Sequence, residues 1–359
     1  MAGFTACCRG KARHVKFLVT GATGFIGGVV ARHLVVRGHE VRALVRSGHD
    51  LDAIRAEGWI PVAGDLLDSA SLAPAVEGVD GVFHVAALYT FWSRESKLLY
   101  QVNVDGTRAV LDSARHAGVR RVVYTSSVGV LRAPPASELA DETFDAEPAQ
   151  LPDHYHRSKL LGERAALAAN GSGLEVVAVN PTAPVGPGDV RPTPTGRIVL
   201  EFLKRRRPGY VDVDLNIVDV EDVAAGHLAA FERGRPGERY ILGGLNTDLA
   251  GVYKLLARAT GLRRRPVRIP YSLAMAAACA DELFEGRLLR RQPYVPINGV
   301  RATRHPVHVD CSKAIRELGL PQSSPERALG AAAAWFVDRG YVRDVSLPAT
   351  AQSGAGVTR

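Results

Sequence analysis

The first half of the chain alternates short, apolar, β-branched runs with helical patterns of apolar and polar positions. The apolar runs predict strands at 16–20, 41–45, 60–64, 79–85, 121–127 and 174–180. The segments between them predict helices at 25–37, 51–56, 71–76, 97–116 and 153–169. Parallel strands need helical crossovers that cover both faces of a sheet, so this order predicts an α/β fold with a doubly wound parallel sheet.

The alternation weakens after Asn180, where proline and glycine become frequent over 181–196. This change indicates a boundary with a smaller C-terminal substrate-binding lobe. Further short strands are expected at 209–213 and 239–242. We assign 15–180 to the sheet domain, with 215–245 returning to it, and 181–214 and 246–345 to the lobe. We expect 1–14 to be a disordered leader and 346–359 a disordered tail.

The composition, 46% hydrophobic and 23% charged residues in a chain of 359, is that of an ordinary globular protein. The formal net charge of +8 comes from scattered residues, with short basic runs at 205–207, 263–265 and 290–291. No basic stretch is interleaved with stacking aromatic residues, so nucleic acid is not expected as a partner. An acidic substrate or an anionic membrane surface fits the charge equally well. A weak membrane association would use the basic runs and the apolar segment 271–280, which is far too short to span a bilayer.

The four cysteines, Cys7, Cys8, Cys279 and Cys311, match neither the spacing of a zinc site nor a small disulfide framework. We therefore expect no metal and a reducing, cytoplasmic location. The leader has a basic end but no apolar run long enough for a signal peptide.

A glycine motif, TGATGFIG at 20–27, directly follows the first predicted strand and opens the first predicted helix. Gly21 would permit a tight turn, Gly24 a close approach of backbone to a pyrophosphate, and Gly27 close packing of the helix. The free N–H groups at the helix start would hold the negative charge. We expect the cofactor contacts in this loop to be Gly21, Thr23, Gly24, Phe25, Ile26 and Gly27.

The residues after the second strand bear on the choice between NAD and NADP. An NAD-preferring enzyme places a carboxylate there, whereas this chain has Val45 followed by Arg46 and Ser47. A guanidinium suits a 2′-phosphate, so NADP(H) is favoured and NAD(H) remains an alternative. Further cofactor contacts are expected at the ends of the third and fourth strands, at Asp65, Leu66, Ala86 and Ala87.

The pattern YHRSK places Tyr155 and Lys159 four residues apart at the start of a predicted helix, so both project from one face. A phenol transfers a proton poorly unless its anion is stabilised, and the Lys159 ammonium can supply that charge and hold the nicotinamide ribose. Ser127, near the end of a predicted strand, would donate a hydrogen bond to the substrate oxygen, with Ser126 or Thr125 in support. We expect His154 and His156, on either side of Tyr155, to be exposed.

These motifs, with NVDGT at 103–107, TSS at 125–127 and NPTAPVGPGD at 180–189, resemble the extended short-chain dehydrogenase/reductase family over 16–341. That family includes sugar epimerases, dehydratases and dihydroflavonol-type reductases and has a Rossmann-type fold. Several segments are more narrowly similar to hopanoid-associated sugar epimerases, at 87–96, 192–199, 211–227 and 237–244.

The resemblance implies roles for individual residues. It gives catalytic roles to Ser127, Tyr155 and Lys159 and cofactor contacts to Gly21, Gly24, Gly27, Asp65, Ala86 and Asn103. It implies substrate contacts at Tyr89, Ser127, Asn180, Thr195, Arg197 and Asn216, although a structural role is equally compatible with Tyr89, Asn180, Thr195, Arg197 and Asn216.

Three functions remain open. Dehydration is disfavoured because no carboxylate follows Thr125 in TSSVGV, where the family's sugar dehydratases carry an Asp-Glu pair. The narrower resemblance favours an epimerase acting on a small-molecule or lipid-linked sugar, whereas Arg46 and the likeness to dihydroflavonol-type reductases favour a reductase that consumes NADPH. A regulator that binds dinucleotide without catalysis is a third hypothesis. Homodimerisation through the two long helices, 97–116 and 153–169, is also considered.

Overall fold

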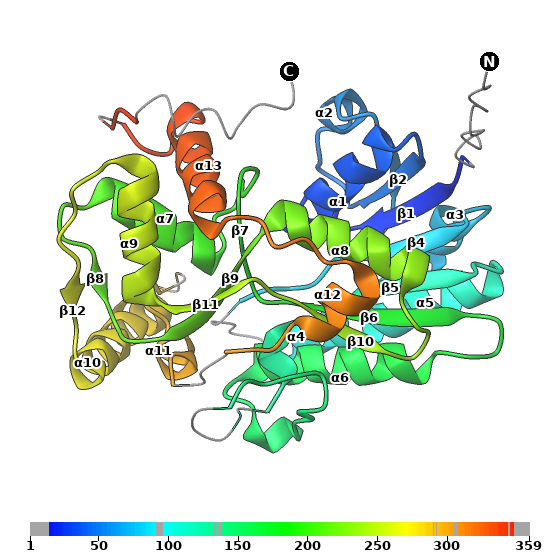
Figure 1. Ribbon diagram of the computed structural model, residues 1–359. Coiled ribbons are helices and arrows are strands. Elements are labelled where there is room, and N and C mark those ends of the chain that lie inside the picture. The colour runs from blue at the N-terminus through cyan, green and yellow to red at the C-terminus, as the bar shows by residue number, and fades with distance from the viewer. Residues whose placement is uncertain are drawn as a thin grey trace, which may run out of the picture.

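The computed structural model describes residues 14–90, 96–132, 134, 138–289, 291, 293–304, 308–343 and 345–347. Its larger part is a parallel sheet of seven strands with helices on both faces, which confirms the predicted fold class (Figure 1). The strands are β1 (Lys16–Thr20), β2 (Glu40–Val45), β3 (Ile60–Ala63), β4 (Gly81–His84), β5 (Arg121–Thr125), β6 (Glu175–Pro181) and β10 (Arg239–Leu242). Their order is β10-β6-β5-β4-β1-β2-β3.

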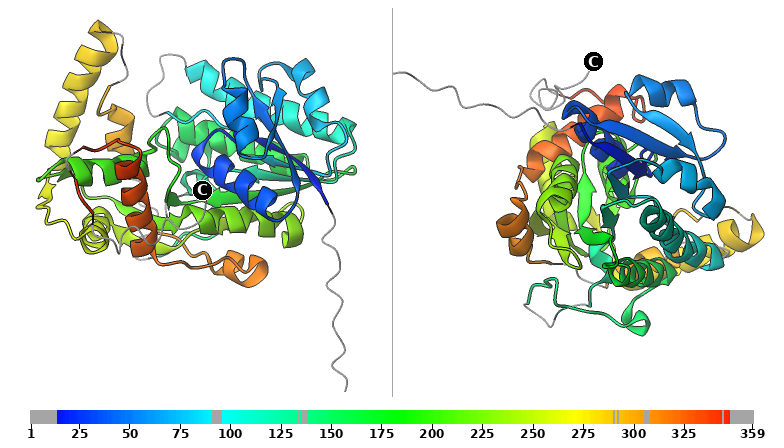
Figure 2. Two further views of the ribbon diagram at one scale, coloured as in Figure 1. Left: turned by 90° about the horizontal axis from the view of Figure 1, so that it is seen from above. Right: turned by 90° about the vertical axis from the view of Figure 1, so that its right-hand side faces the viewer.

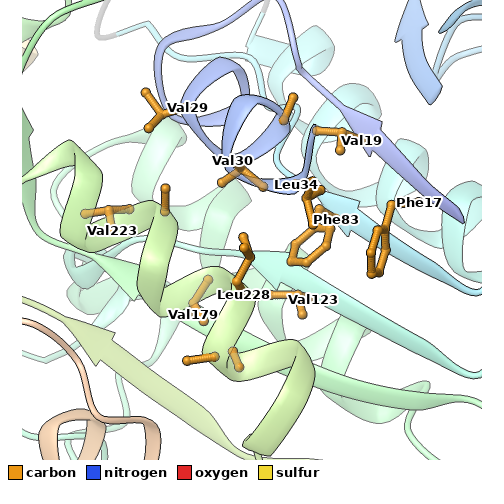
Figure 3. Packing of buried hydrophobic residues seen from close by; sticks show 14 of the residues in the cluster. Phe17, Val19, Val29, Val30, Leu34, Phe83, Val123, Val179, Val223 and Leu228 are labelled. Atoms are coloured by element: carbon orange, nitrogen blue, oxygen red, sulfur yellow. The ribbon is translucent and has the colours of Figure 1, made fainter. Parts of the chain in front are cut away.

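One face of the sheet is covered mainly by α1 (Phe25–Val36) and α8 (Val220–Arg233), which pack on each other. Figure 3 shows Val30 and Leu34 of α1 and Leu228 of α8 meeting above the sheet residues Val19 and Phe83. Strands such as β1 and β4, which helices cover on both faces of the sheet, therefore appear as almost continuous apolar runs in the sequence.

The opposite face is covered by α3 (Ala73–Val76), α5 (Gly106–His116) and α6 (His154–Ala168). The predicted helix 97–116 is helical throughout, as α4 (Ser96–Tyr100), a π-helical segment (Gln101–Asp105) and α5. The short helix α2 (Leu51–Ala56) connects β2 to β3 at the sheet edge. No helix among the described residues is both long and apolar enough to cross a membrane.

The smaller lobe has its own hydrophobic core, built by three helices on a three-stranded sheet. The helices are α7 (Pro194–Lys204), α9 (Leu249–Thr260) and α13 (Pro325–Asp338), and the strands are β7 (Ala183–Val185), β9 (Asp214–Asp219) and β11 (Leu245–Asp248). Beyond them lie a two-stranded sheet and two further helices. These are β8 (Gly209–Tyr210), β12 (Val267–Arg268), α10 (Tyr271–Asp281), which runs into a π-helical segment (Glu282–Leu288), and α11 (Ile297–Ala302).

The chain crosses between the two parts more often than the sequence predicted. Strand β9, predicted within the returning segment 215–245, pairs with β7 and β11 in the lobe, while α8 and β10 do return. Helix α12 (Ser312–Leu318), predicted in the lobe, packs on α8 and β10 through Ala314 and Leu318.

The predicted ends of the chain fall largely outside the described residues. At the C-terminus Ser346 and Leu347 are described; Leu347 is buried in the lobe core, so the predicted tail starts before the packed part of the chain ends. The leader 1–14 lies outside the described residues except for His14.

Candidate active site

The glycine loop lies at the point where the chain reverses direction across the sheet. Strands β1 and β4 are neighbours, but the chain leaves β1 toward β2 and β4 toward β5. The carboxyl ends of such a strand pair form the crevice in which doubly wound folds bind their ligands. Gly21 follows β1 and Val85 and Ala86 follow β4, so both loops border this crevice.

Two glycines of the loop are required by its geometry. Gly21 has φ +74°, and a Cβ there would lie 2.8 Å from the backbone nitrogen of Ala86. A Cβ on Gly27 would lie 2.1 Å from the carbonyl oxygen of Gly21, so α1 is pressed against the turn. Gly24 begins α1 without a side-chain cap, which leaves N–H groups of the first turn available to an anion. The loop therefore fits a dinucleotide pyrophosphate.

A buried chain of hydrogen bonds, which the sequence did not predict, supports this loop from below. Thr107 Oγ1 donates to the Asn103 carbonyl (2.9 Å), so it accepts from His84 Nε2 (3.0 Å). His84 Nδ1 then accepts from Thr20 Oγ1 (2.7 Å), which in turn accepts from Ala86 N–H (3.1 Å). Burial, and then the charge of Lys159, lower the pKa of His84 to about 3, so the ring is neutral. Only a neutral ring can accept a hydrogen bond at Nδ1 while it donates one from Nε2, as this chain of hydrogen bonds requires.

The predicted ribose and adenine contacts lie at the same edge of the sheet. Arg46 and Ser47 follow β2 directly and are exposed. After β3, Asp65 accepts a hydrogen bond from Leu67 N–H (2.9 Å), and Leu66 is buried against Gly106. Arg46 is thus accessible to a ligand, whereas Leu66 belongs to the core beneath α5.

The three predicted catalytic residues are brought together by α6 and the loop after β5. Strand β5 ends at Thr125, two residues earlier than predicted, so Ser127 lies in the loop. Its hydroxyl is hydrogen-bonded to Tyr155, which is buried in the first turn of α6. One turn later, Lys159 Nζ donates to the carbonyl of Thr125 (2.7 Å). A hydroxyl pair and an ammonium therefore meet at the carboxyl end of β5.

The protonation of this centre is set by its burial. Burial, followed by the charge of Asp153, raises the pKa of Tyr155, while the bond to Ser127 opposes the shift. Burial lowers the pKa of Lys159 to about 7, and the charge of Glu163 opposes that shift. Tyr155 is therefore a protonated donor at neutral pH, and Lys159 exchanges its proton near neutrality.

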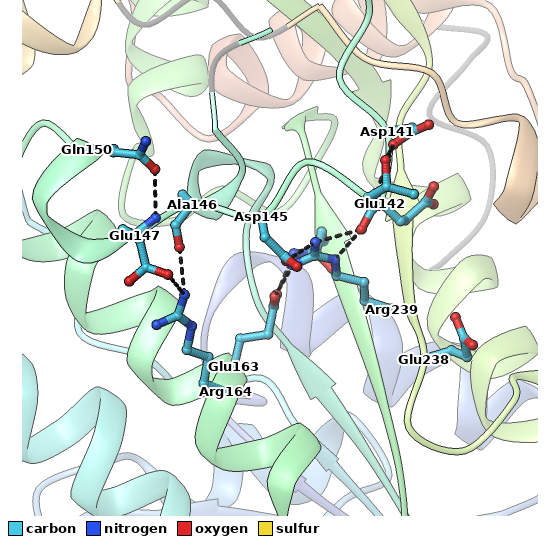
Figure 4. Close-up of polar contacts among 12 residues, drawn as sticks. Asp141, Glu142, Asp145, Ala146, Glu147, Gln150, Glu163, Arg164, Glu238 and Arg239 are labelled. Carbon is cyan, nitrogen blue, oxygen red and sulfur yellow. Dashed lines mark hydrogen bonds and ion pairs between the residues drawn. The ribbon is translucent and has the colours of Figure 1, made fainter.

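A buried ionic network holds α6 against the sheet behind Lys159. Glu163 accepts from Arg239 Nη1 of β10 (2.9 Å) and from Asn180 Nδ2 (2.6 Å). Arg239 also pairs with Asp145 (2.5 Å), as Figure 4 shows. Arg239 thus neutralises Glu163, which is 1% exposed.

The histidines beside Tyr155 differ from each other. His154 is exposed as predicted and lies 3.0 Å from the Tyr100 hydroxyl. The prediction for His156 was wrong: its Nδ1 lies 2.8 Å from Asp153 Oδ2, and its side chain is 12% exposed. Asp153 caps α6 through the N–H of His156, so this pair fixes the helix turn that carries Tyr155.

Two of the predicted substrate residues lie beside the catalytic centre. The Tyr89 ring is 4.5 Å from that of Tyr155, edge to face, and Tyr89 is 45% exposed. Arg197 of α7 is exposed and close enough for its charge to act on Tyr89 and on Asp189. A small pocket next to them is lined by Thr90, Ser96, Leu99, Asp153, His154, Tyr155 and Asn298.

The other predicted contacts are buried in structural positions. Asn180 is fully buried and donates to the Ser127 carbonyl (3.1 Å) as well as to Glu163. The Asn216 amide bonds the backbone of Gly244 and the side chain of Asn246. Asn103, for which a cofactor contact is predicted, is buried and bonds the backbone of Leu88 (2.8 Å) and the side chain of Ser158 (2.9 Å), and Thr195 is 8% exposed on α7. All four side chains are buried, and Asn180 bonds the backbone of Ser127 directly.

Residues 17–243 match the model of the NAD dependent epimerase/dehydratase family. The chain belongs to this family. As a family member, the protein has the sequence and fold of an NAD-dependent oxidoreductase.

Two curated relatives match nearly the full chain. "Putative dihydroflavonol 4-reductase" of Synechocystis is 43% identical over 91% of this chain and 96% of its own. "Sterol demethylase protein B" of Methylococcus capsulatus is 36% identical over 90% of this chain and 99% of its own.

Solved structures agree in fold. The crystal structure of gox2253 is 37% identical, with a TM-score of 0.80, and covers 92% of this chain and 100% of that one. A nucleoside-diphosphate-sugar epimerase from Pseudomonas aeruginosa, PA4631, is 27% identical, with a TM-score of 0.75 and coverages of 92% and 100%. The proteins similar to this chain therefore include both one named as a reductase and one named as an epimerase.

Proposed function

We propose that the protein is an NADP(H)-dependent oxidoreductase that interconverts a carbonyl group and a secondary alcohol on a lipophilic substrate. The observation that carries this proposal is the pair of hydroxyls of the half-buried Ser127 and the buried Tyr155, with the Lys159 ammonium one helical turn away. It lies at the same sheet edge as the uncapped glycine turn that fits a pyrophosphate.

In the direction of reduction, the nicotinamide, when bound, supplies a hydride to the carbonyl carbon. Ser127 donates a hydrogen bond to the carbonyl oxygen, and Tyr155 donates the proton that this oxygen takes up. Lys159 stabilises the phenolate that remains and can hold the ribose hydroxyls. Asn180, through the Ser127 backbone, and Asp153, through the first turn of α6, keep the two hydroxyls in place.

The lipophilic substrate class is supported by the names of the two relatives with nearly full-length matches, a putative dihydroflavonol 4-reductase and a sterol demethylase protein B. A sugar epimerase is the second candidate. It is supported by the similarity to PA4631 and by the likeness of four segments to hopanoid-associated sugar epimerases. An epimerase retains its cofactor and regenerates it in each turnover, so the two functions differ in cofactor exchange.

The first test is to titrate the purified protein with NADPH and NADH, and separately to denature it and identify any dinucleotide released. For a reductase we expect NADPH to bind more tightly, to exchange freely and to be consumed with an added ketone. Tightly retained NAD that is released only on denaturation, without net consumption of NADPH, would establish the epimerase instead.

Arg46 is expected to set the preference for NADPH. Replacing it with glutamine removes the charge that would face a 2′-phosphate, so we expect NADPH affinity to fall about tenfold or more while NADH affinity changes less than about twofold. Arg46 is exposed and follows β2, so the fold should be unaffected. The matched control is Arg55→Gln on α2, also exposed. Equal effects of Arg46→Gln on both cofactors would contradict the assignment.

A further inference from the structure

The helix formed by α10 and the π-helical segment, residues 271–288, stands out from the edge of the lobe, and we call it the wing. Figure 2 shows it, in yellow, projecting away from the body in both views. One side of the wing packs on α11 through Ala274 and Ala278, which are buried with Val300. Tyr271 and Met275 pack partly on the same cluster, and Asp281 accepts a hydrogen bond from the Val295 N–H, whereas the other side of the wing is exposed.

The outward side of the wing is apolar. Leu273, Phe284 and Leu288 are 61%, 56% and 71% exposed, and they are spaced so that they share one side. Between them the exposed positions include Ala276, Ala277 and Ala280, and no charged residue occurs from Tyr271 to Ala280. A surface helix normally places polar residues on its solvent side, so an outward face of this composition indicates a surface that becomes covered.

The segment that contains the wing also carries most of the chain's excess positive charge. Residues 263–304 contain nine arginines and three acidic residues, a net of six positive charges against +8 for the whole chain. Arg263, Arg265, Arg291 and Arg301 are exposed. Arg304, also exposed, lies over the Tyr271 ring at 3.7 Å, at the start of the wing. The three acidic residues, Asp281, Glu282 and Glu285, lie in the wing itself and are half-buried, whereas the exposed arginines lie outside it in the sequence. An exposed apolar face with guanidinium groups on both sides of it in the sequence is complementary to an anionic lipid surface.

The wing is connected to the pocket beside Tyr155 through α11. Helix α11, which packs on α10, contributes Asn298 to the pocket lined by Tyr155. A membrane that covers the wing would therefore lie near the mouth of the active site, where a substrate held in the bilayer could enter.

We propose that the wing docks onto an anionic membrane surface, with Leu273, Phe284 and Leu288 inserted at the interface and the surrounding arginines on the lipid headgroups. The identity of the substrate that would enter from the membrane rests on the proposed function. The docking of the wing is independent of that function. A second copy of the chain is a poorer occupant, because two wings meeting face to face would bring together two strongly positive segments.

The test is flotation of the full-length protein, without cofactor or substrate, with vesicles of phosphatidylcholine and phosphatidylglycerol in equal parts, and with phosphatidylcholine alone. We expect binding to the anionic vesicles that weakens with added salt. The double variant Phe284→Ser/Leu288→Ser should lower the vesicle partition coefficient about tenfold or more, because two inserted side chains are lost. The variant Arg263→Gln/Arg265→Gln should weaken binding to anionic vesicles only.

The matched control is Val36→Ser/Leu67→Ser, which removes two side chains exposed by 78% and 51% on the sheet domain. It should bind vesicles like the unmodified protein. The proposal is overturned if the protein binds no vesicles or if the wing variant and the control bind them equally. It is also overturned if light scattering shows that the unmodified protein self-associates and that the only effect of the wing variant is to break up this assembly. Failure of docking leaves cofactor binding and turnover intact, so it is distinguishable from failure of the proposed function.

Discussion

Replacing Tyr155 with phenylalanine is expected to lower kcat by about 10³-fold while leaving the affinity for NADPH within about twofold of the original. In the proposed mechanism the phenol is the proton donor; it is buried and hydrogen-bonded to Ser127, and its ring packs edge to face on Tyr89. Phenylalanine keeps this packing and removes only the hydroxyl. The measurement is single-turnover and steady-state oxidation of NADPH with an accepted ketone, together with cofactor titration.

Tyr100→Phe is the matched control for this variant, because it also removes a phenolic hydroxyl near the pocket, where that group contacts His154. Its turnover should stay within about twofold of the original. If Tyr155→Phe keeps substantial turnover, the proposed centre is wrong. If the unmodified protein binds dinucleotide but turns over no carbonyl, alcohol or sugar substrate, the non-catalytic regulator becomes the leading hypothesis.

The sequence predicted the central sheet well because its signals are local. Strands such as β1 and β4 are buried on both faces, so they appear as short continuous apolar runs. The glycine turn was also predictable, because Gly21 and Gly27 satisfy steric demands that other residues cannot meet. The pairing of Tyr155 with Ser127 followed once the strand order was assumed.

Contacts between residues far apart in the sequence could not be predicted from such local signals. The Glu163–Arg239 pair joins residues that are 76 positions apart, and the His84 chain depends on the register of β1 with β4. The resemblance implied either a substrate contact or a structural role for Asn180, near the end of β6, and its side chain donates to the Ser127 backbone and to Glu163. A polar residue at a strand end can serve the site either directly or by holding another group, and spacing alone does not distinguish the two.

The wing illustrates the same limit at the surface. Its apolar composition over 271–280 was evident, but only the fold shows that Ala274 and Ala278 face α11 while Leu273 faces outward. The return of α12 to the sheet domain was missed for a related reason, since a short amphipathic helix does not reveal which core receives it.

Replacing Lys159 with methionine is expected to lower kcat by about 10³-fold and to weaken NADPH binding about tenfold, because one buried ammonium serves both the phenolate and the ribose. The same change should alter how stability depends on pH. Burial lowers the pKa of Lys159 to about 7 in the folded protein, from an ordinary value of 10.5. Between these two pH values the unfolded chain binds the extra proton, so Lys159 makes the free energy of unfolding rise with pH across this range.

Methionine binds no proton, so the stability difference between the variant and the unmodified protein isolates this one group. At pH 6.5 the variant should be at least as stable, because it avoids burying a charge. As the pH rises toward 10, its relative stability should fall by roughly 1.4 kcal/mol per pH unit, measured by urea unfolding of both proteins. Lys254→Met, on the exposed side of α9, should show neither effect. A pH-independent difference for Lys159→Met would mean that folding does not lower the pKa of this lysine, and the near-neutral proton exchange assigned to it would have to be abandoned.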